Sequence, residues 1–142
     1  MTESTAASRD VSISISQKRF SSASKRVLLI EDEWVVANDV EHLLRRLGHT
    51  TVGHATNAHD GIRLALETKP DLILMDIHLE GQMNGVQAAV EIVRQHKIPV
   101  IYLTANSHLF LAGNSQMVEP YICIAKPFSE QCVRAAIDSV ST

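Results

Sequence analysis

The sequence predicts an α/β fold, a doubly wound three-layer sandwich with one parallel sheet between two layers of helices. From residue 26 onward, short apolar runs alternate with stretches of helical periodicity, and the connections between them are short. Runs that are apolar on both faces suit buried parallel strands. Because crossover connections are right-handed, five βα units in succession favour helices on both faces of a single sheet.

The strands are expected where the apolar runs lie. Four runs are strongly apolar, whereas Thr50–Ala55 is weaker and lies between the first two of them. The five expected strands are Val27–Ile30, Thr50–Ala55, Leu72–Met75, Val100–Leu103 and Ile122–Ala125.

The helices are expected between these strands, and four of them have recognisable ends. The first amphipathic stretch stops at Gly48, a residue typical of helix C-termini. Asn57, Asn84 and Ser129 stand where each can cap the helix that follows. Residues 106–118 contain a glycine and an asparagine within the pattern, so a short or irregular element is expected there.

Length and composition favour one domain without nucleic-acid or membrane partners. The 142 residues are 45% hydrophobic, and the net charge of −3 comes with scattered lysines and arginines. No basic patch suggests DNA binding, and no apolar run is long enough to span a membrane. The two cysteines, Cys123 and Cys132, lack metal-ligand spacing and suit a reducing cytoplasm. The seven histidines form no metal motif and are interpreted as surface or half-buried residues.

Residues 1–24 differ from the rest of the chain and are interpreted as a flexible N-terminal tail. They are rich in serine and threonine and poor in large apolar side chains. Within them, Val11–Ser16 alternates as a half-buried strand would, which would suit a sheet edge or pairing with another chain. Residues 25–142 are expected to form the single folded domain.

Polar side chains follow four of the expected strands. Glu31 and Asp32 follow the first, Asp76 the third, Thr104 the fourth and Lys126 the fifth. The carboxyl ends of parallel strands meet at one edge of the sheet, where such folds bind ligands. Each residue alone has an ordinary explanation as a turn former, a cap or a solvated charge. Together, clustered carboxylates invite a divalent cation such as Mg²⁺, and an aspartate can be a nucleophile toward phosphorus.

Four short motifs in this order resemble the receiver domains of two-component response regulators, over roughly residues 26–140. They are Val27–Glu33, Leu74–Asp76, Leu103–Ala105 and Lys126–Phe128, and Gly85 also fits. Each motif is weak alone, but the set in this order is highly specific. The resemblance implies the flavodoxin-like strand order 2-1-3-4-5.

The resemblance also implies a role for each residue of the site. Asp76 resembles the phosphoacceptor, and Glu31 and Asp32 resemble the acidic pair that holds Mg²⁺ with it. The backbone carbonyl of His78 would be a further metal ligand. Thr104 resembles the hydroxyl that moves toward the phosphoryl group. Lys126 resembles the cation that pairs with phosphate, and the bond from this lysine to the following proline is usually cis in relatives.

Three features depart from the family pattern. The loop at residues 77–85 is longer than in common receivers, and residues 106–118 are irregular. Cys123 stands where relatives usually carry an aromatic side chain that rotates on activation. The acceptor chemistry is therefore expected to be intact, and the output surface is where this chain is expected to differ.

The expected function is a signalling module, with no catalysis beyond its own phosphorylation and dephosphorylation. The donor would be a histidine kinase or a histidine phosphotransfer protein. The output would be contact with an unknown downstream protein, with homodimers as a further option. An aspartate-nucleophile phosphatase is disfavoured because His78 stands where a second aspartate is common. A mononucleotide binder lacks its glycine-rich loop here, and a degenerate receiver would not keep the complete site.

Overall fold

The structure, a computed structural model, describes residues 23–105 and 121–140. Strands and helices alternate through these residues, as the apolar runs predict. The elements are β2 (Arg26–Ile30), α3 (Trp34–Arg46), β3 (Thr50–Ala55), α4 (Ala58–Thr68), β4 (Leu72–Asp76), α5 (Gly85–Gln95), β5 (Val100–Thr104), β6 (Tyr121–Ala125) and α7 (Glu130–Val140).

The five strands form one parallel sheet in the order β3-β2-β4-β5-β6. Counted along the chain, this is the order 2-1-3-4-5, so the predicted flavodoxin-like topology is confirmed. β4 and β5 each run one residue further than the apolar pattern indicated, so Asp76 and Thr104 are the last residues of their strands. The polar groups of the predicted site therefore begin inside the hydrogen-bonded sheet.

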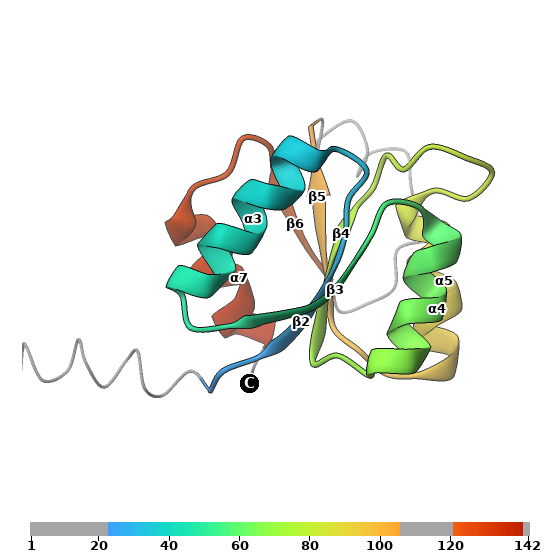
Figure 1. Ribbon diagram of the computed structural model, residues 1–142, viewed down its shortest axis with the longest axis horizontal. Helices are drawn as coiled ribbons and strands as arrows, with labels where there is room; N and C mark the ends of the chain where they lie inside the picture. The colour runs from blue at the N-terminus through green and yellow to red at the C-terminus, as the bar shows by residue number, and fades with distance from the viewer. Residues whose placement is uncertain (1–22, 106–120, 141–142) are drawn as a thin grey trace, which may run out of the picture.

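Helices cover both faces of the sheet, with α3 and α7 on one side and α4 and α5 on the other (Figure 1). Each face has its own apolar core. Leu29, Leu74 and Ile101 belong to the α3 and α7 side, whereas Leu28, Ile73 and Tyr102 belong to the α4 and α5 side. Because adjacent strand residues point to opposite faces, the fully apolar strands supply both cores at once.

Local capping interactions explain where the helices begin. The Asn57 side chain accepts from the Asp60 amide at 2.8 Å, and the Ser129 hydroxyl accepts from the Cys132 amide at 3.1 Å. Asn84 and Gln87 form a reciprocal capping box at the start of α5. All three predicted caps are therefore confirmed, and Gly48 follows α3 with a φ of +90°.

Two sequence predictions lie outside the described residues. One is the irregular element at residues 106–118. The other is the interpretation of residues 1–24 as a flexible tail that includes Val11–Ser16. Of these residues, the structure describes only 23 and 24. Within the described ranges, the helices are all too short or too polar to cross a membrane.

Candidate functional site

The site lies at the carboxyl ends of the strands, where most of its residues are fixed by the hydrogen bonds of the sheet. Glu31 donates its amide to the Ala55 carbonyl at 2.9 Å, and Lys126 donates its amide to the Thr104 carbonyl at 2.8 Å. Glu31, Asp76 and Thr104 are buried. Because these residues stand at the ends of paired strands, their positions depend on the sheet and not on loop conformation.

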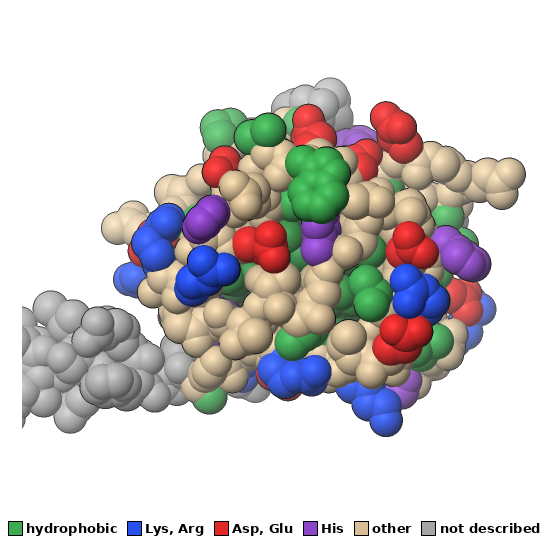
Figure 2. Space-filling model, in the orientation of Figure 1, with side chains coloured by type: hydrophobic (Ala, Val, Ile, Leu, Met, Phe, Trp, Pro, Cys, Tyr) green, Lys and Arg blue, Asp and Glu red, His purple; other side chains and the backbone are tan. Residues whose placement is uncertain are grey.

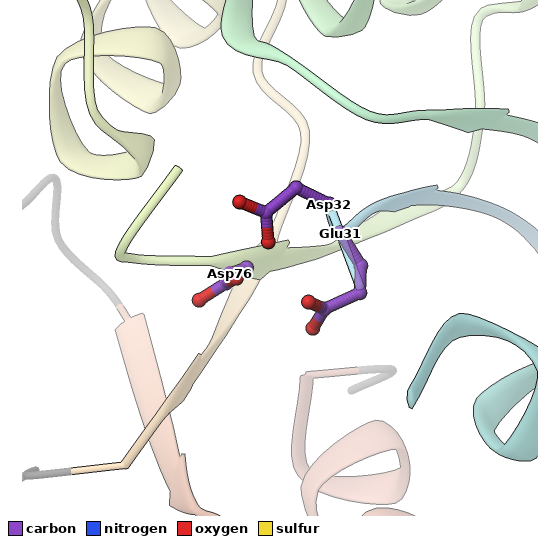
Figure 3. Close-up of side chains that lie close together, drawn as sticks. All are labelled: Glu31, Asp32 and Asp76. Carbon is purple, nitrogen blue, oxygen red and sulfur yellow. The ribbon is translucent and has the colours of Figure 1, made fainter. Parts of the chain in front are cut away.

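Three carboxylates converge at this edge, as the sequence predicted. Glu31 and Asp32 come from the end of β2 and Asp76 from the end of β4 (Figure 3). One oxygen from each lies within 4.8 Å of one from the others. This all-oxygen donor set, with two of its members buried, fits a hard divalent cation such as Mg²⁺.

Lys126 is the cation of the site, and its ammonium group lies between several acids. Its Nζ is 3.0 Å from Glu31 Oε1 and 3.7 Å from Asp76 Oδ1. Glu33, which the sequence reasoning did not single out, adds a carboxylate oxygen at 3.9 Å. The Lys126–Pro127 peptide bond is cis, as the family resemblance implied. The lysine therefore bridges the metal-ligand candidate Glu31 and the acceptor candidate Asp76.

Burial controls the protonation of these groups. Desolvation raises the pKa of Glu31 to about 7. The hydrogen bond from Lys126 opposes this rise, and the nearby charge of Asp76 adds to it. Desolvation also raises the pKa of Asp76, while the Lys126 charge and the His78 amide oppose that rise. Burial disfavours the charged form of Lys126, but its bond to Glu31 and the charge of Asp76 leave its pKa raised. The site thus holds an ammonium among carboxylates that resist ionisation.

The backbone after Asp76 is packed closely around the acceptor. The His78 amide donates to Asp76 Oδ1 at 3.0 Å, and the Gly85 amide donates to the Ile77 carbonyl at 2.9 Å. A Cβ on Gly85 would overlap the Asp76 carbonyl oxygen and lie 2.9 Å from Ile77 Cα. Glycine is therefore required where α5 meets the acceptor strand.

A histidine that sequence reasoning treated as ordinary also contacts the site. His54 Nε2 lies 2.8 Å from the Glu31 carbonyl oxygen, although 23 residues separate the two in sequence. The Glu33 amide donates to Glu31 Oε2 at 3.1 Å. Neither contact has a sequence signal, because each depends on how β2, β3 and the start of α3 come together.

Two of the three departures from the family pattern, Cys123 and the longer loop, lie within the described residues. Cys123 is half-buried and packs against the core on the α4 and α5 side, where burial raises the pKa of its thiol. In the longer loop, Leu79 is buried and Met83 is packed against the same core. The loop is therefore anchored by apolar side chains at two points.

The comparisons with known proteins agree on one protein family. Residues 27–138 match the response regulator receiver domain. The regulator PhyR of Methylorubrum extorquens is 39% identical over 112 residues, which cover 78% of this chain and 41% of that protein. PilH of Pseudomonas aeruginosa is 31% identical, and the match covers 81% of this chain and 96% of PilH. The chain spans between 41% and 55% of the length of PhyR and of PdtaR from Mycobacterium tuberculosis.

Solved structures of receiver domains share the fold of this chain. The receiver domain of a sensor histidine kinase from Pseudomonas aeruginosa superposes with a TM-score of 0.73 at 30% identity, covering 82% of this chain and 97% of that one. That structure has a magnesium ion coordinated in its active-site cleft. With the matching fold and the acidic pocket of Glu31, Asp32 and Asp76, this chain belongs to the response regulator receiver domain family, whose members are signalling modules.

Proposed function

We propose that this receiver accepts a phosphoryl group on Asp76 from a phosphohistidine, with Mg²⁺ bound at the acidic pocket. The observation that carries the proposal is the placement of Asp76. Its carboxylate is buried at the end of β4, with an oxygen within 4.8 Å of oxygens of two further carboxylates and 3.7 Å from the Lys126 ammonium. A structural aspartate would be expected to have fewer acids around it.

The transfer is a displacement at phosphorus. An oxygen of the Asp76 carboxylate forms the new bond to phosphorus, and the bond from phosphorus to the donor imidazole breaks. The imidazole leaves with the electron pair of that bond and takes a proton from solvent. The His78 amide, which donates to Asp76 Oδ1, holds the carboxylate in one orientation for this attack.

Glu31, Asp32, Asp76 and the backbone carbonyl of His78 are the proposed ligands of Mg²⁺. The cluster of three carboxylate oxygens supports this assignment, and the His78 carbonyl comes from the family resemblance. When bound, the metal offsets negative charge on the phosphoryl oxygens. Lys126 stands 3.0 Å from Glu31 in the present arrangement, so we propose that it turns toward the phosphoryl group once Asp76 carries one.

Thr104 is proposed as the hydroxyl that responds to the phosphoryl group. It is buried at the end of β5, next to β4 in the sheet, where Leu103 pairs with Asp76. Its backbone carbonyl accepts the Lys126 amide at 2.8 Å, so the backbone segments that carry the hydroxyl and the ammonium are hydrogen-bonded to each other. A movement of either group toward phosphate is expected to affect the other.

The proposed partners follow from this chemistry. The donor is a histidine kinase or a histidine phosphotransfer protein in the cytoplasm, and the signal leaves through contact with a downstream protein. A homodimer through the last helix and the segment before it is one form that this contact can take.

The experiment is phosphorylation by acetyl phosphate, a small-molecule donor, followed by intact-mass spectrometry. We expect the mass to rise by one phosphoryl group in the presence of Mg²⁺ and to stay unchanged with a chelator. Asp76→Asn should abolish the increase, whereas Asp60→Asn, an aspartate on α4, should leave it intact. Equal labelling in Asp76→Asn and wild type would contradict the assignment.

A further inference from the structure

We propose that His54 is a positioning residue for the metal-binding pair, and that it holds the main chain between Glu31 and Asp32. The inference rests on the function proposed above. It assigns a role to a side chain that is neither a metal ligand candidate nor part of the four family motifs.

The argument begins where the pairing of β2 with β3 stops. Ile30 and Ala55 are the last paired residues, and the Glu31 amide still donates to the Ala55 carbonyl. Beyond this point β3 leaves the sheet, because Asn57 caps α4. His54 Nε2 approaches the Glu31 carbonyl at 2.8 Å, and since a carbonyl only accepts, the imidazole N–H is the donor. The side chain thus extends the ladder by one bond beyond the backbone.

This bond fixes more than one oxygen atom. The peptide group is planar, so the Glu31 carbonyl, the Asp32 amide and the Asp32 Cα move as one unit. Holding the carbonyl oxygen therefore restricts where the Asp32 Cα lies, and with it the point from which the Asp32 side chain leaves the backbone. Asp32 is the half-buried member of the acidic cluster and follows the strand, so it has the greatest need of such support.

The imidazole is itself held in place by the first residue of α3. The rings of Trp34 and His54 meet edge to face, with their centroids 5.0 Å apart and an interplanar angle of 89°. Trp34 is nevertheless 70% exposed, so its indole covers the histidine without being part of the core. His54 is therefore confined between the end of β2 and the start of α3, the two sides of the turn that carries Asp32.

A purely structural role for His54 predicts a different outcome. If the bond only ties β2 to β3, its loss lowers the free energy of unfolding and leaves metal affinity unchanged. If it positions Asp32, its loss weakens Mg²⁺ binding, because groups that orient metal ligands commonly change affinity by about 10- to 100-fold. The two roles are therefore separable by measuring binding and stability on the same variants.

The test compares His54→Gln with His54→Asn and His54→Leu in the full chain at one fixed pH. The glutamine amide can reach the Glu31 carbonyl, whereas asparagine is one methylene shorter and leucine has no donor. Mg²⁺ affinity is measured by titration calorimetry, and exchange of the Asp32 amide is measured by NMR in metal-free protein. His59→Leu, an exposed histidine on α4, is the matched control.

We expect asparagine and leucine to weaken Mg²⁺ binding about 10-fold and to speed Asp32 amide exchange, while glutamine and the His59 control stay within about threefold of wild type. Unchanged affinity and exchange in His54→Asn and His54→Leu, with wild type binding Mg²⁺, would overturn the positioning role alone. Equal losses in all three His54 variants would overturn it too. Absence of Mg²⁺ binding in wild type would overturn the proposed function itself.

Discussion

The two ends of the sheet handle polar groups in opposite ways. At the carboxyl ends, Glu31, Asp32 and Asp76 lie close together with Lys126 as the cation among them. At the amino ends, polar groups are matched one to one. The Arg26 amide donates to Asp71 at 2.8 Å, and its guanidinium donates to the carbonyls at the end of α4.

This difference shows where the fold gains stability and where it gives some up. Hydrogen bonds between matched groups each contribute roughly 1 kcal/mol, and the amino end collects several of them. Like charges brought together out of water destabilise the folded state until a cation or a proton compensates them. At the carboxyl end three clustered carboxylates face the single ammonium group of Lys126, so this end is expected to be the less stable of the two.

The largest expected effect comes from filling the space beside the acceptor strand. Gly85→Ala places a methyl group against the Asp76 carbonyl, where backbone atoms cannot move aside. We expect a loss of about 3 kcal/mol in unfolding free energy, together with slower phosphorylation, since the Asp76 backbone must shift. Chemical denaturation and acetyl phosphate labelling of the same sample measure both.

Gly48→Ala is the matched change at the opposite end of the sheet. Nothing lies within 4 Å of a Cβ there, and the strain comes from a φ of +90° alone. It should cost about 1 kcal/mol and leave the labelling rate unchanged. If both variants slow phosphorylation equally, the acceptor is sensitive to stability in general and the comparison between the two ends fails.

The next effect is a loss of stability with rising pH at the carboxyl end. Burial raises the pKa of Glu31 from 4.5 to about 7, so the folded chain holds this proton more tightly than the unfolded chain. In metal-free protein, the free energy of unfolding should therefore fall as pH rises from about 4.5 to about 7, by on the order of 2 kcal/mol. Denaturation in the presence of a chelator at several pH values measures it.

Glu31→Gln is the control, because the amide keeps the shape of the side chain and does not titrate. This variant should be more stable than wild type at pH 7 and should have a flatter pH profile. Added Mg²⁺ should raise the free energy of unfolding of the wild-type protein at pH 7 and should have little effect on that of the variant. A wild-type profile that is as flat as that of the variant would contradict the argument.

A smaller effect of opposite sign is expected at the amino end. His49 is buried, and desolvation lowers its pKa below the usual 6.5, while its Nδ1 accepts the Lys25 amide at 3.0 Å. The unfolded chain therefore takes up this proton first. The contribution of His49 is fully present above pH 6.5 and is lost as the pH falls through the folded pKa.

His49→Asn separates this effect from that of Glu31. The asparagine carbonyl can stand in for Nδ1 as an acceptor but does not titrate in this range. In a Glu31→Gln background, the acid-side loss of stability should be smaller with asparagine than with histidine. The difference should not exceed the roughly 1 kcal/mol of one hydrogen bond. An identical profile for the two would mean that the buried histidine does not contribute to acid sensitivity.

Sequence alone predicted the parts of this structure that depend on local pattern. Asn57, Asn84 and Ser129 are read as caps because a cap bonds to an amide two or three residues later. The convergence of Glu31 and Asp76 also follows from pattern, since Glu31 directly follows β2 and Asp76 ends the neighbouring parallel strand β4.

The contacts that sequence missed all depend on tertiary geometry. The resemblance implied that Lys126 pairs with phosphate, and nothing in the sequence indicated its 3.0 Å contact with Glu31, which is shorter than its 3.7 Å distance to Asp76. His54 was interpreted, like the other histidines, as an ordinary surface or half-buried residue, because nothing in its neighbours along the chain indicates a contact with the Glu31 carbonyl. The partners of a side chain on an edge strand depend on which segments the tertiary structure brings close, and such contacts leave no periodic pattern in the sequence.

The smallest expected effect is that of removing residues 1–22. The described chain enters the sheet at Lys25, whose amide bonds to His49 and whose carbonyl accepts the Thr50 amide. A protein beginning at Ala23 keeps both bonds, so we expect its unfolding free energy to stay within about 0.5 kcal/mol of the full chain, with unchanged labelling by acetyl phosphate.

A larger loss would give the alternating segment Val11–Ser16 a structural role. Among the described residues, β3 pairs only with β2, and it lies at the end of the sheet. The chain enters beside the first residue of β3, so an antiparallel strand along its outer edge would need only the intervening residues 17–24 as a connection. In that case Ile13→Asp should destabilise the full chain as much as the deletion does, because a strand of this kind buries one face.

If neither the deletion nor Ile13→Asp changes the free energy of unfolding, the folded unit begins near Lys25. The amino end of the sheet then derives its stability from Arg26, Asp71 and His49 without help from the tail.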